Sequence, residues 1–288
     1  MKKILITGLN SYVGTSFEKW LSQWPDEYYV DTIDMIDGTW REKSFTGYDV
    51  VFHVAGIAHV SADQSKKDLY YRINRDLAVD TAKKAKIEGV KQFIFMSSMI
   101  IYGADEPVGK EKIITRDTPP NPADFYGDSK LQADLAIQKM ADDKFIVSIM
   151  RPPVIYGPGC KGNFPKLLKL AKYALIFPNI ENRRSMIYID NFTECVRLVI
   201  NNASGGIFFP QNEEYVATKD VIADYRKIMG KLTVMLPFPA FAGNIFSKST
   251  LFNKAFGSKI YEKRPSSNGN YNVINFREGL SRMCTHVR

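Results

Sequence analysis

Short apolar segments alternate with longer segments of helical character in the first half of the chain. Several of the short segments are apolar without alternation, as in Val50-Val51-Phe52, which is expected of strands that are covered on both faces. This succession of strand and helix predicts an α/β fold with a doubly wound parallel sheet. The predicted strands are Lys3–Thr7, Tyr28–Asp34, Asp49–Ala55, Gln92–Ser97 and Phe145–Met150, and the predicted helices cover about 12–24, 68–88 and 122–141.

The start of the last of these helices has its own signals. Asn121 suits the N-cap and Pro122 suits the first helical position. After Arg151-Pro152-Pro153 the regular pattern ends, although Met186–Asp190 still predicts a strand and 191–202 a helix. We therefore expect a main domain of residues 1–157, to which 186–203 return. Residues 158–185 and 204–288 would form a smaller, mixed α/β substrate-binding domain.

Leu232–Phe246 is strongly apolar and has no amphipathic pattern. Burial in the core of the smaller domain is the favoured interpretation. Contact with a membrane surface or a partner is the alternative, but the prolines and the lack of a basic face argue against an interfacial helix.

Composition and charge narrow the class of protein. The chain has 288 residues and a formal charge of +8, but its Lys and Arg residues are scattered, which argues against a nucleic-acid-binding surface. No uncharged apolar run reaches the ~20 residues of a membrane span, and the N-terminal residues do not have the pattern of a signal peptide. The three cysteines fit neither a disulfide framework nor a metal site, so we expect no metal and a cytoplasmic location.

Tyr126 and Lys130 are the leading catalytic candidates. Residues four apart share one face of a helix, and a neighbouring ammonium is expected to lower the pKa of a tyrosine. A hydroxyl such as that of Ser98 would hold a substrate oxygen while Tyr126 moves a proton. The pattern thus predicts acid–base chemistry on an alcohol or a carbonyl, provided that a cofactor takes the hydride.

A glycine turn near the start of the chain indicates that cofactor. Gly8 and Gly14 stand between a predicted strand and a predicted helix, where backbone N–H groups approach a pyrophosphate in a Rossmann-type fold. Asp34 follows the next strand and is the favoured ribose anchor, with Asp31 and Asp37 as competitors. Because no Arg is close to this point, NAD is favoured over NADP.

With these pieces together, the chain resembles the extended short-chain dehydrogenase/reductases, in the NAD-dependent epimerase/dehydratase family of nucleotide-sugar enzymes. The resemblance covers almost the whole length, and the motifs occur in the family's order and spacing. They are Thr7-Gly8-x-x-Ser11-x-x-Gly14, Phe52-His53-Val54-Ala55-Gly56, Asn74, Ser97-Ser98-Met99-Ile100-Ile101-Tyr102-Gly103, Tyr126-x-x-x-Lys130, Arg151-Pro152-Pro153-Val154-Ile155-Tyr156-Gly157-Pro158-Gly159 and Arg184-Ser185-Met186-Ile187-Tyr188-Ile189-Asp190-Asn191.

The resemblance implies roles for individual residues. Ser98, Tyr126 and Lys130 would be the catalytic residues, while Ser98, Asn163 and Arg184 would bind the substrate, the last through its diphosphate. Two positions depart from the family pattern, since Ser11 replaces a glycine and Val154 replaces an asparagine. The expected cofactor-binding residues are Gly8, Ser11, Tyr12, Val13, Gly14, Asp34, Ala55, Gly56, Asn74, Ser97, Tyr126, Lys130 and Pro153.

The reaction that we expect is epimerisation at C4 of a UDP-type sugar, such as UDP-glucose or UDP-GlcNAc, by transient hydride transfer to NAD. The alternative is an NAD(P)H-dependent reductase of a nucleotide 4-keto-sugar in polysaccharide biosynthesis. A non-catalytic dinucleotide-binding regulator is less favoured, because the whole triad is present. Dehydration is also less favoured, because Met99-Ile100 stand where dehydratases of the family carry Asp-Glu. Relatives often form homodimers through a four-helix bundle that would include the 122–141 helix.

Overall fold

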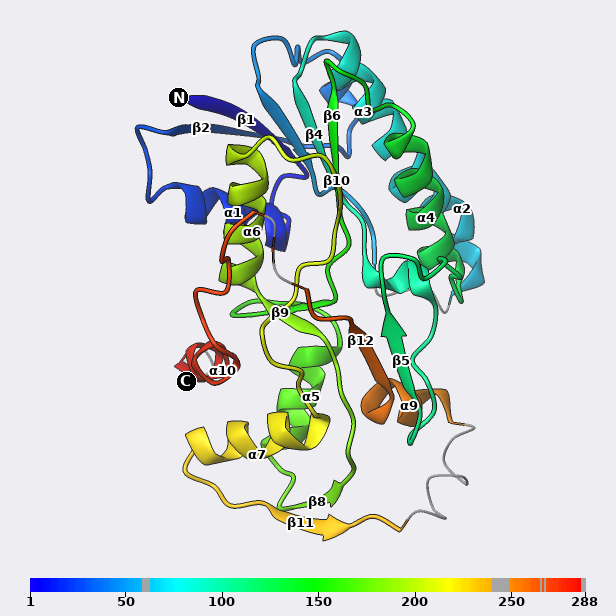
Figure 1. Ribbon diagram of the computed structural model, residues 1–288, viewed down its shortest axis with the longest axis vertical. Helices are drawn as coiled ribbons and strands as arrows, with labels where there is room; N and C mark the ends of the chain where they lie inside the picture. The colour runs from blue at the N-terminus through cyan, green and yellow to red at the C-terminus, as the bar shows by residue number, and fades with distance from the viewer. Residues whose placement is uncertain (59–62, 240–248, 265, 267, 286–288) are drawn as a thin grey trace.

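A six-stranded parallel sheet forms the centre of the molecule (Figure 1). The computed structural model describes residues 1–58, 63–239, 249–264, 266 and 268–285. The order of the strands in the sheet is β10-β6-β4-β3-β1-β2, so the predicted doubly wound α/β fold is confirmed. The strands are β1 (Lys2–Thr7), β2 (Tyr28–Ile33), β3 (Val50–His53), β4 (Gln92–Met96), β6 (Ile146–Met150) and β10 (Gly206–Phe208).

Helices cover both faces of this sheet, as unbroken apolar strands require. Ile4 and Ile6 of β1 pack on one face with side chains of α1 and α6, whereas Leu5 packs on the opposite face with α3 and α4. This division follows from the period of two along a strand. The helices are α1 (Tyr12–Leu21) and α6 (Ile189–Asn201) on one side, and α2 (Lys67–Tyr70), the π-helical η3 (Tyr71–Leu77), α3 (Ala78–Ile87) and α4 (Phe125–Gln138) on the other (Figure 1).

Helix α4 begins later than the sequence predicts. Its N-cap is Asp124, whose carboxylate accepts a hydrogen bond from the Gly127 N–H at 2.8 Å. Asn121 lies three residues before this cap, and its N–H donates to the carbonyl of Ile101 at 2.9 Å. This contact between distant segments holds Asn121 outside the helix in spite of its local capping signal. The strand expected at Met186–Asp190 is likewise shorter, since β9 ends at Tyr188 and α6 starts at Ile189.

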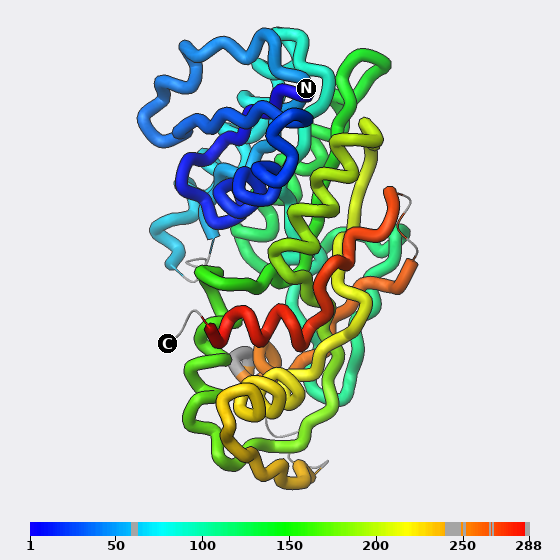
Figure 2. Tube along the Cα trace, turned by 90° about the vertical axis from the view of Figure 1, so that its left-hand side faces the viewer, coloured from blue at the N-terminus to red at the C-terminus, as the bar shows by residue number. Residues whose placement is uncertain are grey.

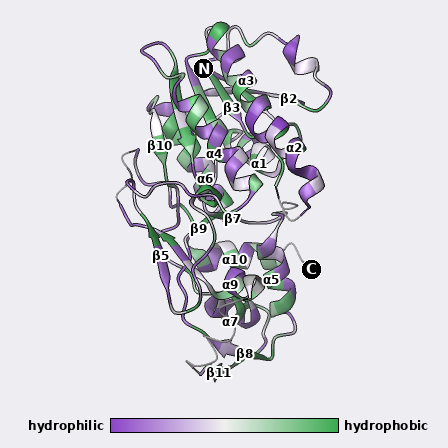
Figure 3. Cartoon of the chain, turned by 90° about the vertical axis from the view of Figure 1, so that its right-hand side faces the viewer, coloured by the Kyte–Doolittle hydropathy of each residue, from purple (hydrophilic) through white to green (hydrophobic). Residues whose placement is uncertain are grey.

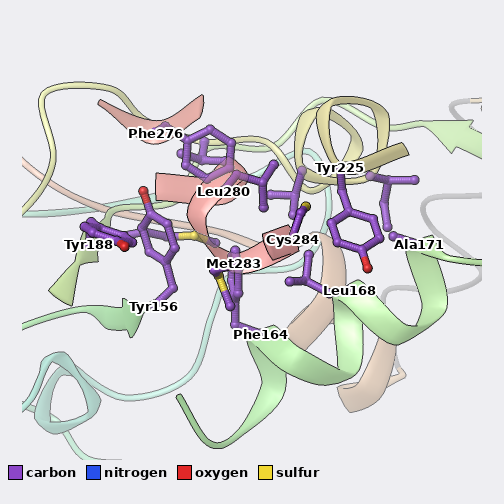
Figure 4. Close-up of a cluster of buried hydrophobic side chains, with 14 of the residues drawn as sticks. Tyr156, Phe164, Leu168, Ala171, Tyr188, Tyr225, Phe276, Leu280, Met283 and Cys284 are labelled. Atoms are coloured by element: carbon purple, nitrogen blue, oxygen red, sulfur yellow. The ribbon is translucent and has the colours of Figure 1, made fainter. Parts of the chain in front are cut away.

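A second core lies beyond the carboxyl ends of the sheet strands (Figure 4), and α10 lies between α6 and α7 (Figures 1 and 2). Tyr156, Phe164 and Leu168 pack there with residues of α7 and α10. The elements of this region are β7 (Val154–Tyr156), α5 (Asn163–Ala171), β8 (Ile176–Asn179), β9 (Met186–Tyr188), α7 (Thr218–Ile228), β11 (Val234–Pro237), α9 (Thr250–Phe256), β12 (Ser258–Tyr261), α10 (Phe276–Thr285) and, paired with β12, β5 (Glu111–Ile114).

Two expectations about the second half do not fit the structure. The expected boundary at residue 204 does not coincide with the sheet, because β10 pairs with β6 and completes it. The apolar stretch that begins at Leu232 is mostly exposed in its described part: Leu232 is 85% exposed, and Val234 and Leu236 of β11 are also exposed, whereas Met235 packs against the second core. Residues 240–246 of that stretch lie outside the described residues. None of the helices in the described ranges has the length and apolar character needed to cross a bilayer.

Candidate active site

The candidate site lies where the order of the strands reverses. The chain runs from β1 outward to β2 and then returns to the other side of β1 to form β3. In open α/β sheets, ligands bind at such a switch point, beyond the carboxyl ends of the strands. The loops after β1 and β3 meet there, because a Cβ on Gly8 would lie only 3.1 Å from the backbone of Ala55. Gly8 also has a φ of +109°, which glycine adopts without strain.

The turn into α1 has the form of a phosphate cradle. Ser11 is the N-cap, and its hydroxyl accepts a hydrogen bond from the Gly14 N–H at 3.1 Å. A Cβ on Gly14 would lie 2.5 Å from that hydroxyl oxygen, so only glycine fits. The first N–H groups of a helix have no partner within it and attract an anion. The buried hydroxyl of Tyr12 has no hydrogen-bond partner among the described residues. This cradle and unpaired hydroxyl fit a dinucleotide.

Asp34 is the best placed of the three acidic candidates for the ribose. It directly follows Ile33, whose carbonyl accepts hydrogen bonds from the N–H groups of Gly8 and Leu9. The Asp31 carboxylate is already bonded to Lys43 and Tyr48, each at 2.6 Å. Asp37 instead accepts two bonds from Thr39.

Ser98 and Tyr126 are brought together by a close approach of two helical turns. Ser98 caps the short 3₁₀ turn η4 (Met99–Tyr102), and Tyr126 is the second residue of α4. A Cβ on Gly127 would meet Pro122 at 2.9 Å and the carbonyl of Ile100 at 3.1 Å, so this glycine permits the approach. The side chains of Tyr126 and Ser98 are hydrogen-bonded to one another.

The electrostatics of this pair differ from the expectation. Burial raises the pKa of Tyr126 to about 12, assisted by Tyr70 and partly opposed by the hydrogen bond to Ser98. Burial also lowers the pKa of Lys130 to about 8, although Asp134 opposes this change. The expected lowering of the tyrosine pKa is therefore not met, because desolvation of the phenol raises it.

Lys130 is fixed beneath the loop that follows β3. Its ammonium donates to the carbonyl of Met96 at 2.9 Å, and a Cβ on Gly56 would lie 3.1 Å from its Nζ. The fully buried Asn74 accepts from the N–H of Ile57 and donates to its carbonyl. Asn74 thus uses its amide to hold this loop.

A buried polar network, which the sequence analysis missed, supports the catalytic helix from behind. The carboxylate of Asp134 accepts a hydrogen bond from Ser97 at 2.6 Å and a bidentate pair from Arg151 at 2.8 and 2.9 Å. Arg151 also donates to the hydroxyl of Tyr102 at 2.6 Å. Asp134 and Arg151 are 0% and 4% exposed, so this network joins α4, β4, β6 and η4 in the interior.

This network changes the interpretation of one predicted residue. The hydroxyl of Ser97, expected at the cofactor, is 2% exposed and bonded to Asp134. A signal for the network was available in the sequence, because Asp134 is four residues after Lys130 and therefore shares its helix face. Its basic partner comes from a distant strand, which local spacing does not reveal.

The predicted substrate residues have different surroundings. Asn163 is exposed at the first position of α5. Arg184 forms an ion pair with Asp105 and donates to the carbonyls of Lys254 and Ala255. Lys259 also pairs with Asp105, at 3.1 Å. The guanidinium expected to bind phosphate is thus bonded to protein oxygens in this structure.

The fold and the switch-point site define a Rossmann-type enzyme that uses a dinucleotide for hydride transfer. A model of the NAD dependent epimerase/dehydratase family matches residues 4–209. The chain belongs to this family, so the predicted resemblance is confirmed, and NAD is its cofactor.

Individual relatives agree with this assignment. The chain is 30% identical to a UDP-glucose 4-epimerase of Vibrio cholerae, over 89% of this chain and 86% of the relative. It is 25% identical to an N-acetyl-alpha-D-glucosaminyl-diphospho-ditrans,octacis-undecaprenol 4-epimerase of Escherichia coli O157:H7, over 82% and 76% of the two chains. The fold is similar to that of a UDP-glucuronic acid 4-epimerase from Bacillus cereus in complex with NAD, with a TM-score of 0.75, 18% identity and coverage of 99% and 98%.

Proposed function

We propose that the chain is an NAD-dependent epimerase that inverts C4 of a UDP-type sugar. The observation that carries the proposal is the contact of Ser98 with Tyr126, which is followed four residues later on α4 by buried Lys130. Family membership and the 4-epimerase relatives support the same reaction.

The residues of the triad have distinct tasks in this proposal. Ser98 holds the C4 oxygen, and Tyr126 takes the proton of that hydroxyl as the carbon is oxidised. The chemistry that bound NAD would supply is to accept the C4 hydride and to give it back to the other face of the ketone after the ketone has turned over. As the hydride returns, Tyr126 gives the proton back to the C4 oxygen. Lys130, held by the carbonyl of Met96, fixes the geometry and keeps a positive charge beside the reacting groups.

The cofactor would lie across the loops that follow β1 and β3. Gly8, Ser11, Tyr12, Val13 and Gly14 would surround the pyrophosphate. Asp34 would bind the adenosine ribose because it directly follows Ile33, whose carbonyl is bonded to the N–H groups of Gly8 and Leu9 in the glycine turn; its own bond is to the N–H of Ile36. Ala55, Gly56 and Pro153 would line the nicotinamide half, while Asn74 and Ser97 would act through the bonds that they make to Ile57 and Asp134.

The substrate diphosphate would replace Asp105 as the partner of Arg184. Arg184 contacts Asp105 through Nη2, and a guanidinium binds phosphate oxygens as it binds carboxylate oxygens, so this nitrogen would donate to the diphosphate instead. Asn163 would contact the diphosphate from the start of α5.

The test is to incubate the purified protein with UDP-glucose and no added cofactor. Formation of UDP-galactose, with NAD released on denaturation, supports epimerisation. A protein that lacks bound dinucleotide and consumes NADPH only with a nucleotide 4-keto-sugar would be a reductase instead. The same assay with UDP-GlcNAc defines the sugar.

We also propose that the protein acts in the cytoplasm, where the thiols of its three cysteines stay reduced, and that it binds no nucleic acid. A homodimer through α4 is consistent with the exposed side chain of Leu135 on that helix. Sedimentation equilibrium of the Leu135→Glu variant tests the dimer.

A further inference from the structure

One end of the molecule exposes an apolar surface. Strands β8 and β11 form this end, on the side of the second core that faces away from the central sheet (Figures 1 and 3). Single exposed apolar residues are common, but a contiguous group marks a contact site. We call this group the tip surface; it consists of Tyr173, Leu175, Ile176, Leu232, Val234 and Leu236, all exposed.

The pairing of the two strands brings part of this group together. Val234 is paired with Ile176 in the parallel register, and the Val234 N–H donates to the carbonyl of Leu175 at 2.8 Å. Phe177 and Met235 pack against the second core, so the alternation of side chains along a strand places Ile176, Val234 and Leu236 on the outer face. The other three residues are exposed in the segments that lead into the two strands.

A buried arginine holds this surface in place. Arg226 is 5% exposed. Its guanidinium donates two hydrogen bonds to the carbonyl of Leu232, at 2.6 and 3.0 Å, and one each to those of Ala171 and Lys172. It thereby ties the end of α5 to the start of β11. The apolar side chains are thus presented by an ordered framework.

The charge around the tip surface is mainly positive, and the exposed Glu181, which follows β8, is paired with Lys219. Lys169, Lys172, Lys227 and Lys231 are exposed beside it. The sequence contains no Asp or Glu in residues 144–180 or 225–261, the two segments that form this end. A symmetric contact with a second copy would place lysines against lysines. The complementary occupant is apolar and anionic.

We propose that the tip surface docks on the surface of an anionic lipid bilayer. Its leucine, isoleucine and valine side chains enter the boundary between headgroups and acyl chains, and its lysines contact lipid phosphates. Long lysine side chains reach a polar layer while their stems stay on apolar surface. This is peripheral binding, which adds to the proposed function and needs no membrane-spanning segment.

The test is cosedimentation of the full chain with vesicles, at low salt. One set of vesicles is phosphatidylcholine alone, and the other is an equal mixture with phosphatidylglycerol. We expect binding to the anionic vesicles only, and a loss of binding at high salt. Each lysine near such a surface changes the affinity about fivefold, so replacing Lys169, Lys172, Lys227 and Lys231 by Gln weakens binding at least about tenfold. Leu232→Ser with Leu236→Ser removes the apolar contact and also weakens it.

A matched control comes from the opposite part of the molecule. Lys83→Gln with Ile87→Ser changes one exposed lysine and one exposed apolar residue of α3 and should leave binding unchanged. The proposal is overturned if the wild type stays in the supernatant with anionic vesicles, or if the tip variants still cosediment like the wild type. It is also overturned if the wild type does not bind vesicles and is instead a dimer that the tip variants dissociate. Because sedimentation needs no turnover, failure here leaves the proposed epimerase activity untouched.

Discussion

Proteins usually bury apolar side chains and expose polar ones. The interior behind α4 departs from this rule because it buries polar groups, and the tip surface departs from it because it exposes apolar ones. Behind α4, Ser97, Asp134 and Arg151 are buried and bonded to one another. At the tip, Leu232 and Ile176 are apolar and exposed. Buried charge and exposed apolar surface both cost stability relative to the ordinary arrangement. Both departures agree with our proposals that the first positions catalytic groups and that the second contacts a bilayer.

The largest effect is expected within the triad itself. Tyr126→Phe removes the hydroxyl that moves the proton, while the ring keeps its edge contact with Tyr70. Turnover should fall about 10²- to 10⁴-fold, with a melting temperature close to that of the wild type. The control is Tyr71→Phe, which removes a hydroxyl bonded to Asp128 and should change turnover only slightly. Equal turnover in wild type and Tyr126→Phe would refute the catalytic assignment.

The next effect concerns the buried ion pair. Asp134→Ala leaves Arg151 without its carboxylate in the interior, and we expect a loss of about 3–5 kcal/mol of unfolding free energy in chemical denaturation. The double variant Asp134→Leu, Arg151→Met should recover most of that stability. We expect its turnover to stay reduced, because the link from α4 to Ser97 is lost. Recovery of both stability and turnover would show that the pair does not position the site.

A smaller effect concerns the free energy that is lost when the ammonium of Lys130 is buried. Burial lowers its pKa from 10.5 to about 8, so between these values the unfolded chain binds more protons than the folded one. The stability contribution of this group is therefore lost as the pH falls from about 10.5 to about 8. Lys130→Met removes the penalty, and its stability relative to wild type should be greater at pH 7 than at pH 10.5 by about 3 kcal/mol.

The control for this titration is Lys139→Met, since Lys139 is exposed at the end of the same helix. Denaturation midpoints of the three proteins at the two pH values give the comparison. A constant difference between Lys130→Met and wild type would contradict the lowered pKa.

The sequence predicts five of the six sheet strands well because each of these carries its own signal, whereas the short β10 was missed. Val50-Val51-Phe52 can only be covered on both faces, and Gly8 and Gly14 stand at a turn where a Cβ would clash. The start of α4 was missed because Asn121 is engaged by Ile101, a contact between distant segments. The Asp134–Arg151 pair also depends on the packing of α4 against β6, and local spacing carries no information about it.

The tip surface was misread for a related reason. An apolar run without a clear period is usually buried, and the alternation from Leu232 to Leu236 is short. Only the pairing of β11 with β8 decides which of its side chains face the second core. Strand pairing at the edge of a small region is a tertiary property, so the sequence alone favoured burial.

The smallest predicted effect tests whether Leu232 is exposed, as the structure shows, or part of the core, as the sequence favoured. Leu232→Ser should change the unfolding free energy by no more than about 0.5 kcal/mol, because an exposed side chain loses little contact on substitution. Phe177→Ala, in the paired strand but 6% exposed, should cost about 3–5 kcal/mol through the cavity that it leaves in the second core. Urea denaturation of both variants gives the comparison. If Leu232→Ser were as destabilising as Phe177→Ala, Leu232 would be part of the core. Its side chain would then not be available for contact with a bilayer.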